Sequence, residues 1–164
     1  MRAGVWVMLA LALALAACGG SDGTREGSSV PVVARAEKVG EAELDDAWYD
    51  AFGFATSDAL GTVYRTSASL PEVTAYYSDG ITAEGWTVVA SAPMAMAQTV
   101  MASKDDRVAM LTLMSGETYT TAPGLGGLED MGITIDNVAD DETIVTVQEF
   151  TCDEDDVGRC TFLQ

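Results

Sequence analysis

The sequence of 164 residues predicts an α+β fold: a two-layer sandwich with a mostly antiparallel sheet of about four or five strands and two helices on one face. Two observations predict this class. Apolar residues recur at helical spacing in two stretches of the chain, and β-prone segments separated by turn residues follow the second stretch. Because short turns join most of these segments, we expect neighbouring strands to pair in antiparallel fashion.

The first predicted helix begins at about Glu41 and ends at Gly53. Acidic residues crowd its first turns, where the helix dipole favours negative charge. Its apolar residues share one face: Leu44, Ala47, Trp48, Ala51 and Phe52. This face is expected to pack on the core, and binding to a membrane surface or to a partner is the alternative.

The second predicted helix begins at Ser69-Leu70-Pro71-Glu72, which has the S-x-x-E form of a capping box with proline in the first turn. An apolar stripe continues from this start: Val73, Tyr76, Tyr77 and Ile81. Gly85 is expected to end the helix, and Gly80 weakens the prediction for its second half.

Strands are predicted on both sides of this second helix. They lie at residues 61–67, 86–91, 99–104, 108–114 and 143–150. Asp105-Asp106 separates two of them, which predicts a hairpin. The acidic, glycine-rich residues 116–141 are predicted to be a long loop, either functional or simply mobile.

The N-terminus has the features of an export signal. A short positive start at Arg2 precedes an apolar run at residues 5–17, which is too short to span a bilayer. The run ends at Leu15-Ala16-Ala17-Cys18, which resembles the lipobox of bacterial lipoproteins. The resemblance implies that residues 1–17 are a removed signal peptide and that Cys18 is lipidated. An ordinary secreted protein or an uncleaved anchor is the alternative.

The segment after Cys18 is rich in glycine, serine and threonine, so residues 18–35 are predicted to be a flexible tether and residues 36–164 a single α+β domain. The lipoprotein resemblance implies that the lipid on Cys18 holds this domain to the cell membrane or the outer membrane, on the exported side. Gly19 stands where some Gram-negative lipoproteins carry an inner-membrane Asp, which favours the outer membrane in such a source.

Residues 63–86 show a second resemblance. Their sequence, VYRTSASLPEVTAYYSDGITAEGW, looks like a small strand–helix–strand module found in uncharacterised bacterial lipoproteins. Its characteristic residues all have structural explanations, so the resemblance implies a fold and no particular activity.

The composition excludes several functions. Twenty-six acidic residues face 8 basic ones, which gives a net charge of −18, and histidine is absent. Such an acidic chain is a poor nucleic-acid binder, because phosphate contacts need Lys and Arg. The missing imidazole removes Ser-His and Cys-His catalytic sites and most zinc and haem sites. We therefore expect a non-catalytic protein without a cofactor.

Two cysteines remain once Cys18 carries lipid. Cys152 and Cys160 are predicted to form a disulfide, because an exported compartment permits one. The ring that they close is short, and chain entropy predicts a stabilisation of about 2.6 kcal/mol.

The segment inside this ring is strongly acidic. Asp153, Asp155 and Asp156 are candidate calcium ligands, although Val157 and Gln164 stand where a calcium loop needs oxygen ligands. A solvated acidic hairpin is the simpler interpretation, and no metal site is predicted.

Methionines are the candidate soft-metal ligands: Met94, Met96, Met101, Met110 and Met114. Thioethers suit Cu(I), but methionine also fills apolar cores, which is the simpler interpretation. Residues 124–127 (GLGG) lack the spacing of a phosphate loop. Ser103 and Lys104 are neighbours on a predicted strand, so their side chains are expected to point to opposite faces. The acidic clusters at 129–130 and 140–142 are expected to be solvated.

These observations support three hypotheses. The first is a lipid-anchored, non-catalytic envelope protein that binds another protein or assists assembly. The second is a module for a small apolar or sugar ligand, bound by aromatic side chains between the helices and the sheet. The third is a hydrolase that uses paired carboxylates. The aromatic candidates for the second are Trp48, Tyr49, Phe52, Phe54, Tyr76, Tyr77 and Trp86.

Overall fold

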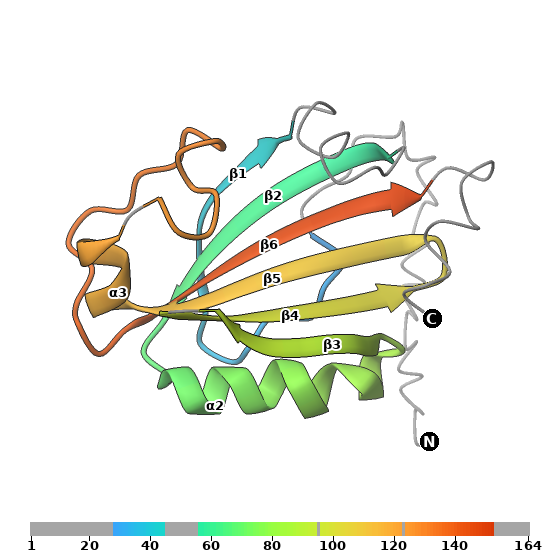
Figure 1. Ribbon diagram of the computed structural model, residues 1–164, viewed down its shortest axis with the longest axis horizontal. Helices are drawn as coiled ribbons and strands as arrows, with labels where there is room; N and C mark the ends of the chain where they lie inside the picture. The colour runs from blue at the N-terminus through green and yellow to red at the C-terminus, as the bar shows by residue number, and fades with distance from the viewer. Residues whose placement is uncertain (1–27, 45–55, 95, 123, 153–164) are drawn as a thin grey trace, which may run out of the picture.

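The computed structural model describes residues 28–44, 56–94, 96–122 and 124–152. The described residues form one sheet of six strands in the order β1-β2-β6-β5-β4-β3, and every neighbouring pair is antiparallel. The sheet is curved (Figure 1). The strands are β1 Glu37–Glu43, β2 Thr56–Thr66, β3 Thr87–Met94, β4 Ala97–Lys104, β5 Arg107–Ser115 and β6 Thr143–Cys152. The α+β class is confirmed, and the sheet has six strands rather than four or five.

The predicted second helix is present, but it changes type along its length. α2 (Leu70–Ala75) continues into a π-helix, η1 (Tyr76–Gly80), and then into a 3₁₀ helix, η2 (Ile81–Glu84). The capping box is confirmed, because the Ser69 backbone N–H and hydroxyl both donate to Glu72 Oε2, at 2.9 and 2.7 Å. Gly85 ends η2 with φ 83°, a left-handed conformation that suits glycine.

A second helix, α3 (Gly116–Thr121), lies inside the segment that was predicted to be a loop. Its first turn is capped by Ser115, whose hydroxyl oxygen accepts from the Thr118 N–H at 3.1 Å. Glycine at its first position is required by packing, because a Cβ at Gly116 would lie 1.9 Å from the Ala139 carbonyl oxygen.

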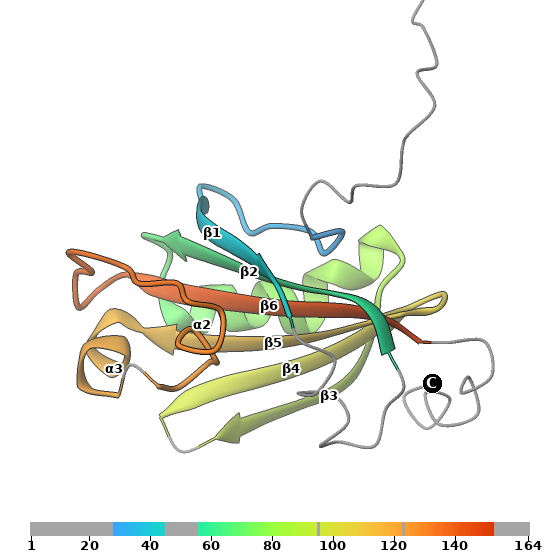
Figure 2. The ribbon, with the colours of Figure 1, turned by 90° about the horizontal axis from the view of Figure 1, so that it is seen from above.

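α2 and α3 cover opposite faces of the sheet. Successive strand residues alternate between the faces, so that Leu113 packs with α2, η1 and η2 while Met114 packs with α3. We call these the α2 face and the α3 face. In Figure 2, α2 lies behind the sheet and the loop that follows α3 passes in front of it. The two α-helices of the described residues therefore lie on opposite faces rather than on one, and α3 is not one of the two helices that the sequence predicts.

Residues 116–122 and 124–142 form a packed layer, which we call the α3 cover. Leu128, Met131 and Ile135 are buried against the sheet, and the Ile135 N–H donates to the Tyr119 hydroxyl at 3.0 Å. Acidic side chains of this segment point to solvent while its apolar ones face the sheet. The segment is therefore a structural layer rather than a mobile loop.

The predicted first helix is not seen where it was expected to begin. Glu41 and Glu43 lie in β1, where Glu41 pairs with Thr62 of β2. The charged, alternating side chains of this segment suit an exposed edge strand. The helix was predicted here because acidic residues are also favoured in the first turn of a helix. The remainder of that predicted helix, residues 45–53, lies outside the described residues.

β1 and β3 form the two edges of the sheet. β1 is charged, and Lys38 Nζ contacts Glu41 Oε2 at 2.7 Å. β3 carries no charged residue and is mostly exposed. Its regular backbone is interrupted by a bulge between Val88 and Ala90 and by Pro93.

Residues 28–33 form an extended segment that we call the strap. Val30 and Val33 are buried in the core of the α2 face, at 3 % and 8 % exposure. The C-terminal part of the predicted tether is therefore packed on the domain. Residues 18–27, and with them Cys18 and the signal segment, lie outside the described residues. Among the residues that the structure describes, no helix is long and apolar enough to cross a bilayer.

Candidate ligand-binding groove

An open groove of about 610 Å³ lies between α2–η1 and the turn that joins β3 to β4. Its lining is mainly apolar and entirely uncharged: Leu70, Pro71, Thr74, Ala75, Ser78, Met96, Ala97 and Gln98. The volume falls within the range that small-molecule sites occupy.

The helical wall of the groove is a single stripe of residues. Pro71, Thr74, Ala75 and Ser78 follow one another at helical spacing, so they share one side of α2–η1. Val73 points the other way and is fully buried in the core. The same amphipathic segment therefore closes the core with one side and forms the groove with the other.

The opposite wall is the β3–β4 turn, which α3 holds in place. Thr118 Oγ1 donates to the Met96 carbonyl oxygen at 3.2 Å. The side chains of Met94 and Met96 remain 59 % and 52 % exposed. Flexible thioethers in such a position can adapt to ligands of different shape.

Uncharged polar groups lie at one end of the groove. Gln98 Nε2 donates to Ser91 Oγ at 2.9 Å, and the hydroxyls of Ser78 and Ser91 are 3.3 Å apart. Residues 85–103, which include β3, the turn and most of β4, carry no charged side chain at all in this acidic protein. The groove can therefore accept apolar groups and neutral hydrogen-bonding groups without burying a charge.

The aromatic residues predicted to line a site lie instead in the core or outside the described residues. Tyr77 and Trp86 are buried between the helical layer and the sheet. Tyr76 meets Tyr77 edge to face, with ring centroids 5.0 Å apart. Trp48, Tyr49, Phe52 and Phe54 lie outside the described residues.

Burial raises the pKa of Tyr77 well above its usual value, and the Val33 backbone opposes this shift only in part. Among the residues that the structure describes, the Tyr77 hydroxyl and the Trp86 indole N–H find no well-formed hydrogen bond. Tyr76 has a raised pKa too, because of burial and the nearby Glu84 carboxylate. Both tyrosines are therefore neutral at ordinary pH, Tyr77 as a core side chain and Tyr76 as a partly buried one.

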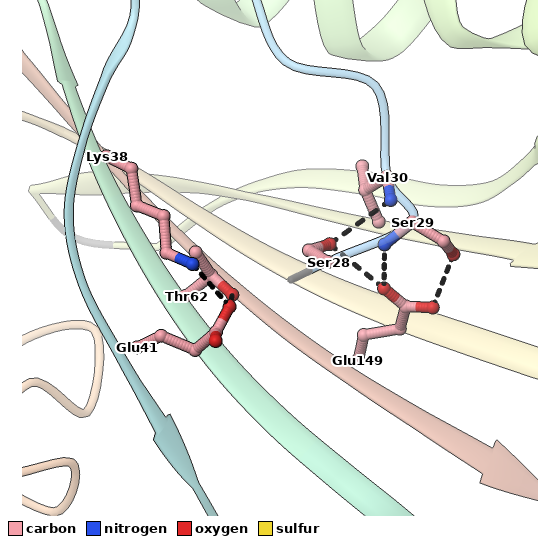
Figure 3. A network of polar contacts seen from close by, with 7 residues as sticks. All are labelled: Ser28, Ser29, Val30, Lys38, Glu41, Thr62 and Glu149. Atoms are coloured by element: carbon pink, nitrogen blue, oxygen red, sulfur yellow. Dashed lines mark hydrogen bonds and ion pairs between the residues drawn. The ribbon is translucent and has the colours of Figure 1, made fainter. Parts of the chain in front are cut away.

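Glu149 is the buried acidic residue of the described chain, and it holds the strap (Figure 3). Its two carboxylate oxygens accept from the Ser28 hydroxyl at 2.9 Å, the Ser29 N–H at 2.7 Å and the Ser29 hydroxyl at 2.5 Å. Arg107 Nη1 lies 3.6 Å from the same carboxylate. The hydrolase hypothesis requires paired carboxylates, whereas this carboxylate contacts Ser28, Ser29 and Arg107.

A second polar cluster in Figure 3 lies at the β1 edge. The Glu41 carboxylate contacts Lys38 Nζ and accepts a long hydrogen bond of 3.4 Å from Thr62 Oγ1. Tyr64 lies on the α2 face of the sheet. Its pKa is raised by burial first and then by the Glu41 and Glu149 carboxylates.

The structure does not gather the candidate soft-metal ligands. Met94 and Met96 flank the β3–β4 turn, and Met94 Sδ accepts from Thr99 Oγ1 at 3.1 Å. Met101 and Met110 pair across β4 and β5, and Met114 is buried on the α3 face. Clusters of three or more acidic or cysteine ligands are not found among the described residues.

The remaining candidates have structural positions. Lys104 Nζ donates to the Glu84 carbonyl oxygen at 2.9 Å, while Ser103 is buried on β4. Gly126 and Gly127 adopt positive φ values in the α3 cover. Cys152 is buried at the end of β6, but Cys160 and the calcium candidates Asp153, Asp155 and Asp156 lie outside the described residues, so their prediction stays a prediction.

Sequence reasoning missed the groove itself. Thr74, Met96 and Gln98 come from separate elements, and only the packing of the β3–β4 turn against α2 brings them together. The available sequence signal was the closely spaced pair Met94 and Met96, which was interpreted as soft-metal ligands or as core side chains.

Comparison with known proteins gives one similarity. Residues 54–123 match the family model described as START domain-like, and this segment covers less than half of the chain. No curated protein and no solved structure matches the chain. The matched segment contains β2, α2, η1, η2, β3, β4, β5, α3 and every residue that lines the groove. The residues that line the groove therefore fall within the segment that is similar to START domain-like proteins.

Proposed function

We propose that this protein is a ligand-binding module whose groove between α2–η1 and the β3–β4 turn takes a small, largely apolar and uncharged ligand. The observation that carries the proposal is the coincidence of the groove with the START domain-like segment, because all lining residues fall within residues 54–123. The apolar, uncharged lining supports the ligand class.

Electrostatics supports the exclusion of anionic ligands. The chain has a net charge of −18, and the groove contributes no Lys or Arg to offset it. An anionic ligand would therefore enter an unfavourable potential without a compensating ion pair. The Ser78 and Gln98 side chains, which line the groove, offer neutral hydrogen bonds to a hydroxyl or amide group instead.

The ligand class can be tested with two apolar fluorescent probes of similar size. We expect N-phenylnaphthylamine, which is neutral, to bind with enhanced fluorescence, and anilinonaphthalene sulfonate, which is anionic, to bind at least about tenfold more weakly. Equal binding of both probes would contradict the electrostatic argument. No binding of either would contradict the ligand-binding function.

The position of the site can be tested by filling the groove. Ala75 is exposed and lines the groove, so Ala75→Trp is expected to block it. Ala83→Trp is the matched control, because Ala83 is also exposed and helical but does not line the groove. Unchanged probe affinity in Ala75→Trp would place the ligand elsewhere.

We further propose that a lipid on Cys18 holds this module at the cell envelope, on the exported side. The Leu15-Ala16-Ala17-Cys18 sequence and the short apolar run before it support this location. Cys18→Ser is expected to release the protein from membranes into the soluble fraction. Retention of the variant in washed membranes would overturn the lipid anchor.

Protein interaction is the second candidate function. The exposed side chains of Met94 and Met96 favour it, because they place two neighbouring apolar groups at the tip of a hairpin. Met94→Lys, which lies outside the groove lining, would weaken a partner complex in cross-linked envelopes, whereas Ala75→Trp would leave it intact. Loss of the complex in Ala75→Trp with retention in Met94→Lys would contradict docking at the hairpin tip.

A further inference from the structure

The five-residue helical segment η1 contacts the strap and also contributes to the wall of the groove. On the strap side, the Tyr76 hydroxyl donates to the Val32 carbonyl oxygen at 3.3 Å in an exposed contact, and Tyr77 belongs to the same buried cluster as Val30 and Val33. On the groove side, Ser78 lines the wall and meets the Ser91 hydroxyl. The segment η1 is thus the physical link between residues 28–33 and the ligand site.

This link is the least regular part of the helical layer. η1 is a π-helix, a form that is rare and depends on its tertiary contacts more than an α-helix does. Gly80 ends it, and glycine contributes little local preference for a helix. We therefore expect the shape of η1, and with it the position of Ser78, to depend on what packs against Tyr76 and Tyr77.

The strap is fixed to the sheet by the buried side chains of Val30 and Val33 and by polar contacts to Glu149. Three hydrogen bonds from Ser28 and Ser29 end on this carboxylate, and Val30 N–H closes the turn by donating to the Ser28 hydroxyl at 3.1 Å. Hydrogen bonds to a charged acceptor are stronger than neutral ones. Loss of the two serine hydroxyls would remove two of these three bonds and leave the backbone donor in place.

We propose that the strap is a regulatory element: bound to Glu149, it holds η1 in the form that shapes the groove, and its release from Glu149 weakens ligand binding. The proposal rests on the proposed ligand-binding function of the groove. It adds a second site, which is the surface of the α2 face that residues 28–33 cover. Binding of the strap to this surface is coupled to ligand binding in the groove through Tyr76, Tyr77 and Ser78.

The coupling between the bound strap and ligand binding acts in both directions. Thermodynamic linkage requires that a ligand in the groove stabilises the bound strap by the same factor by which the bound strap improves ligand affinity. Coupling factors between protein sites are commonly about fivefold or more. This reciprocity provides a measurement on the unaltered protein as well as one on variants.

The first test removes the two serine hydroxyls. The double variant Ser28→Ala with Ser29→Ala is expected to bind N-phenylnaphthylamine about fivefold more weakly than the wild type. The matched control is Ser67→Ala with Thr134→Ala, which removes two exposed hydroxyls away from Glu149 and the groove. Near-ultraviolet circular dichroism of both variants checks that the fold is retained.

The second test uses the wild-type chain and does not depend on any variant. The backbone N–H of Ser29 donates directly to Glu149, so its hydrogen exchange reports the bound strap. Saturation with N-phenylnaphthylamine is expected to slow this exchange about fivefold, while amides of the distant β1 edge stay unchanged.

The outcomes separate the two proposals. Probe binding that is equal in the wild type and the Ser28/Ser29 variant, with unchanged exchange at Ser29, would overturn the strap mechanism and leave the ligand-binding function standing. Absence of probe binding to the wild type would overturn both. Weaker binding in the variant together with slower exchange in the wild type supports the coupling.

Discussion

The two faces of the sheet are both buried, but they are covered by different kinds of structure. The α2 face is closed by a continuous helical layer, with Trp86 and Tyr77 fully packed beneath it. The α3 face is closed by one short helix and an irregular segment that uses Gly126, Gly127 and Gly132 at positive φ. The side chains along a strand alternate between the two faces, and this pattern predicts which of them are buried. It does not predict what kind of structure covers each face.

The largest expected loss of stability tests whether the side chains buried on each face of the sheet are true core residues. Trp86→Ala on the α2 face is expected to lower the free energy of unfolding by about 3–5 kcal/mol, because it leaves a large cavity. Leu128→Ala on the α3 face is expected to lower it by about 2–5 kcal/mol for the same reason. Denaturant unfolding measures both. A negligible effect of Leu128→Ala would mean that the α3 cover contributes little to folding.

A smaller effect is expected where the α3 cover meets the helix start. Gly116→Ala would place a Cβ 1.9 Å from the Ala139 carbonyl oxygen, so the backbone must move, at a cost of roughly 1–3 kcal/mol. Gly80→Ala on the other face is the control, because its Cβ would meet only Tyr76 at 3.4 Å. Thermal melts should fall for Gly116→Ala and stay level or rise for Gly80→Ala.

Removal of a buried hydroxyl is expected to change stability in the opposite direction. Thr146 Oγ1 is buried on the α3 face without a hydrogen-bond partner in the described structure. Thr146→Val keeps the shape and removes the unsatisfied group, so the free energy of unfolding should rise by about 1 kcal/mol. A fall of similar size in chemical denaturation would show that the hydroxyl does find a partner, for example an ordered water.

The smallest effect concerns pH and distinguishes the caps of the two helices. Hydrogen bonds from Ser69 hold the pKa of Glu72 below its usual value. The cap of α2 is therefore fully present above the ordinary glutamate pKa and is lost as pH falls through the lowered one. α3 is capped by the neutral Ser115, which does not titrate in this range.

The measurement is a series of thermal melts from pH 7 to pH 3. The wild type and Glu72→Gln should differ slightly at neutral pH and converge at acid pH, because protonated Glu72 resembles glutamine. A constant difference across the series would contradict a charge-dependent cap.

Local signals predicted the elements that depend on local chemistry. The capping box at Ser69 and Glu72, the helix end at Gly85 and the hairpin at Asp105-Asp106 are all confirmed. Each depends on residues that lie within a few positions of one another. β1 was missed because an exposed edge strand rich in Glu, Lys and Gly has weak β preference and is stabilised by its pairing with β2.

Features built from distant residues could not be predicted in the same way. Residues 116–141 have the composition of a loop, and only contact with Val63 and Ile144 of the sheet makes Leu128 and Met131 core residues. Glu149 belongs to a strand of mostly buried residues, and its partners Ser28 and Ser29 are 120 or more positions away. The groove likewise required the β3–β4 turn to meet α2.

The two sheet edges have a consequence for aggregation. Unpaired strand edges can recruit other chains and start fibrils, and proteins prevent this in different ways. β1 carries charged side chains, whose repulsion weakens as salt screens it, and a bulge between Lys38 and Gly40. β3 has no charges, and its bulge and Pro93 obstruct pairing whatever the ionic strength. In concentrated salt, therefore, β1 keeps its bulge but loses the protection of its charges, whereas the protection of β3 stays unchanged.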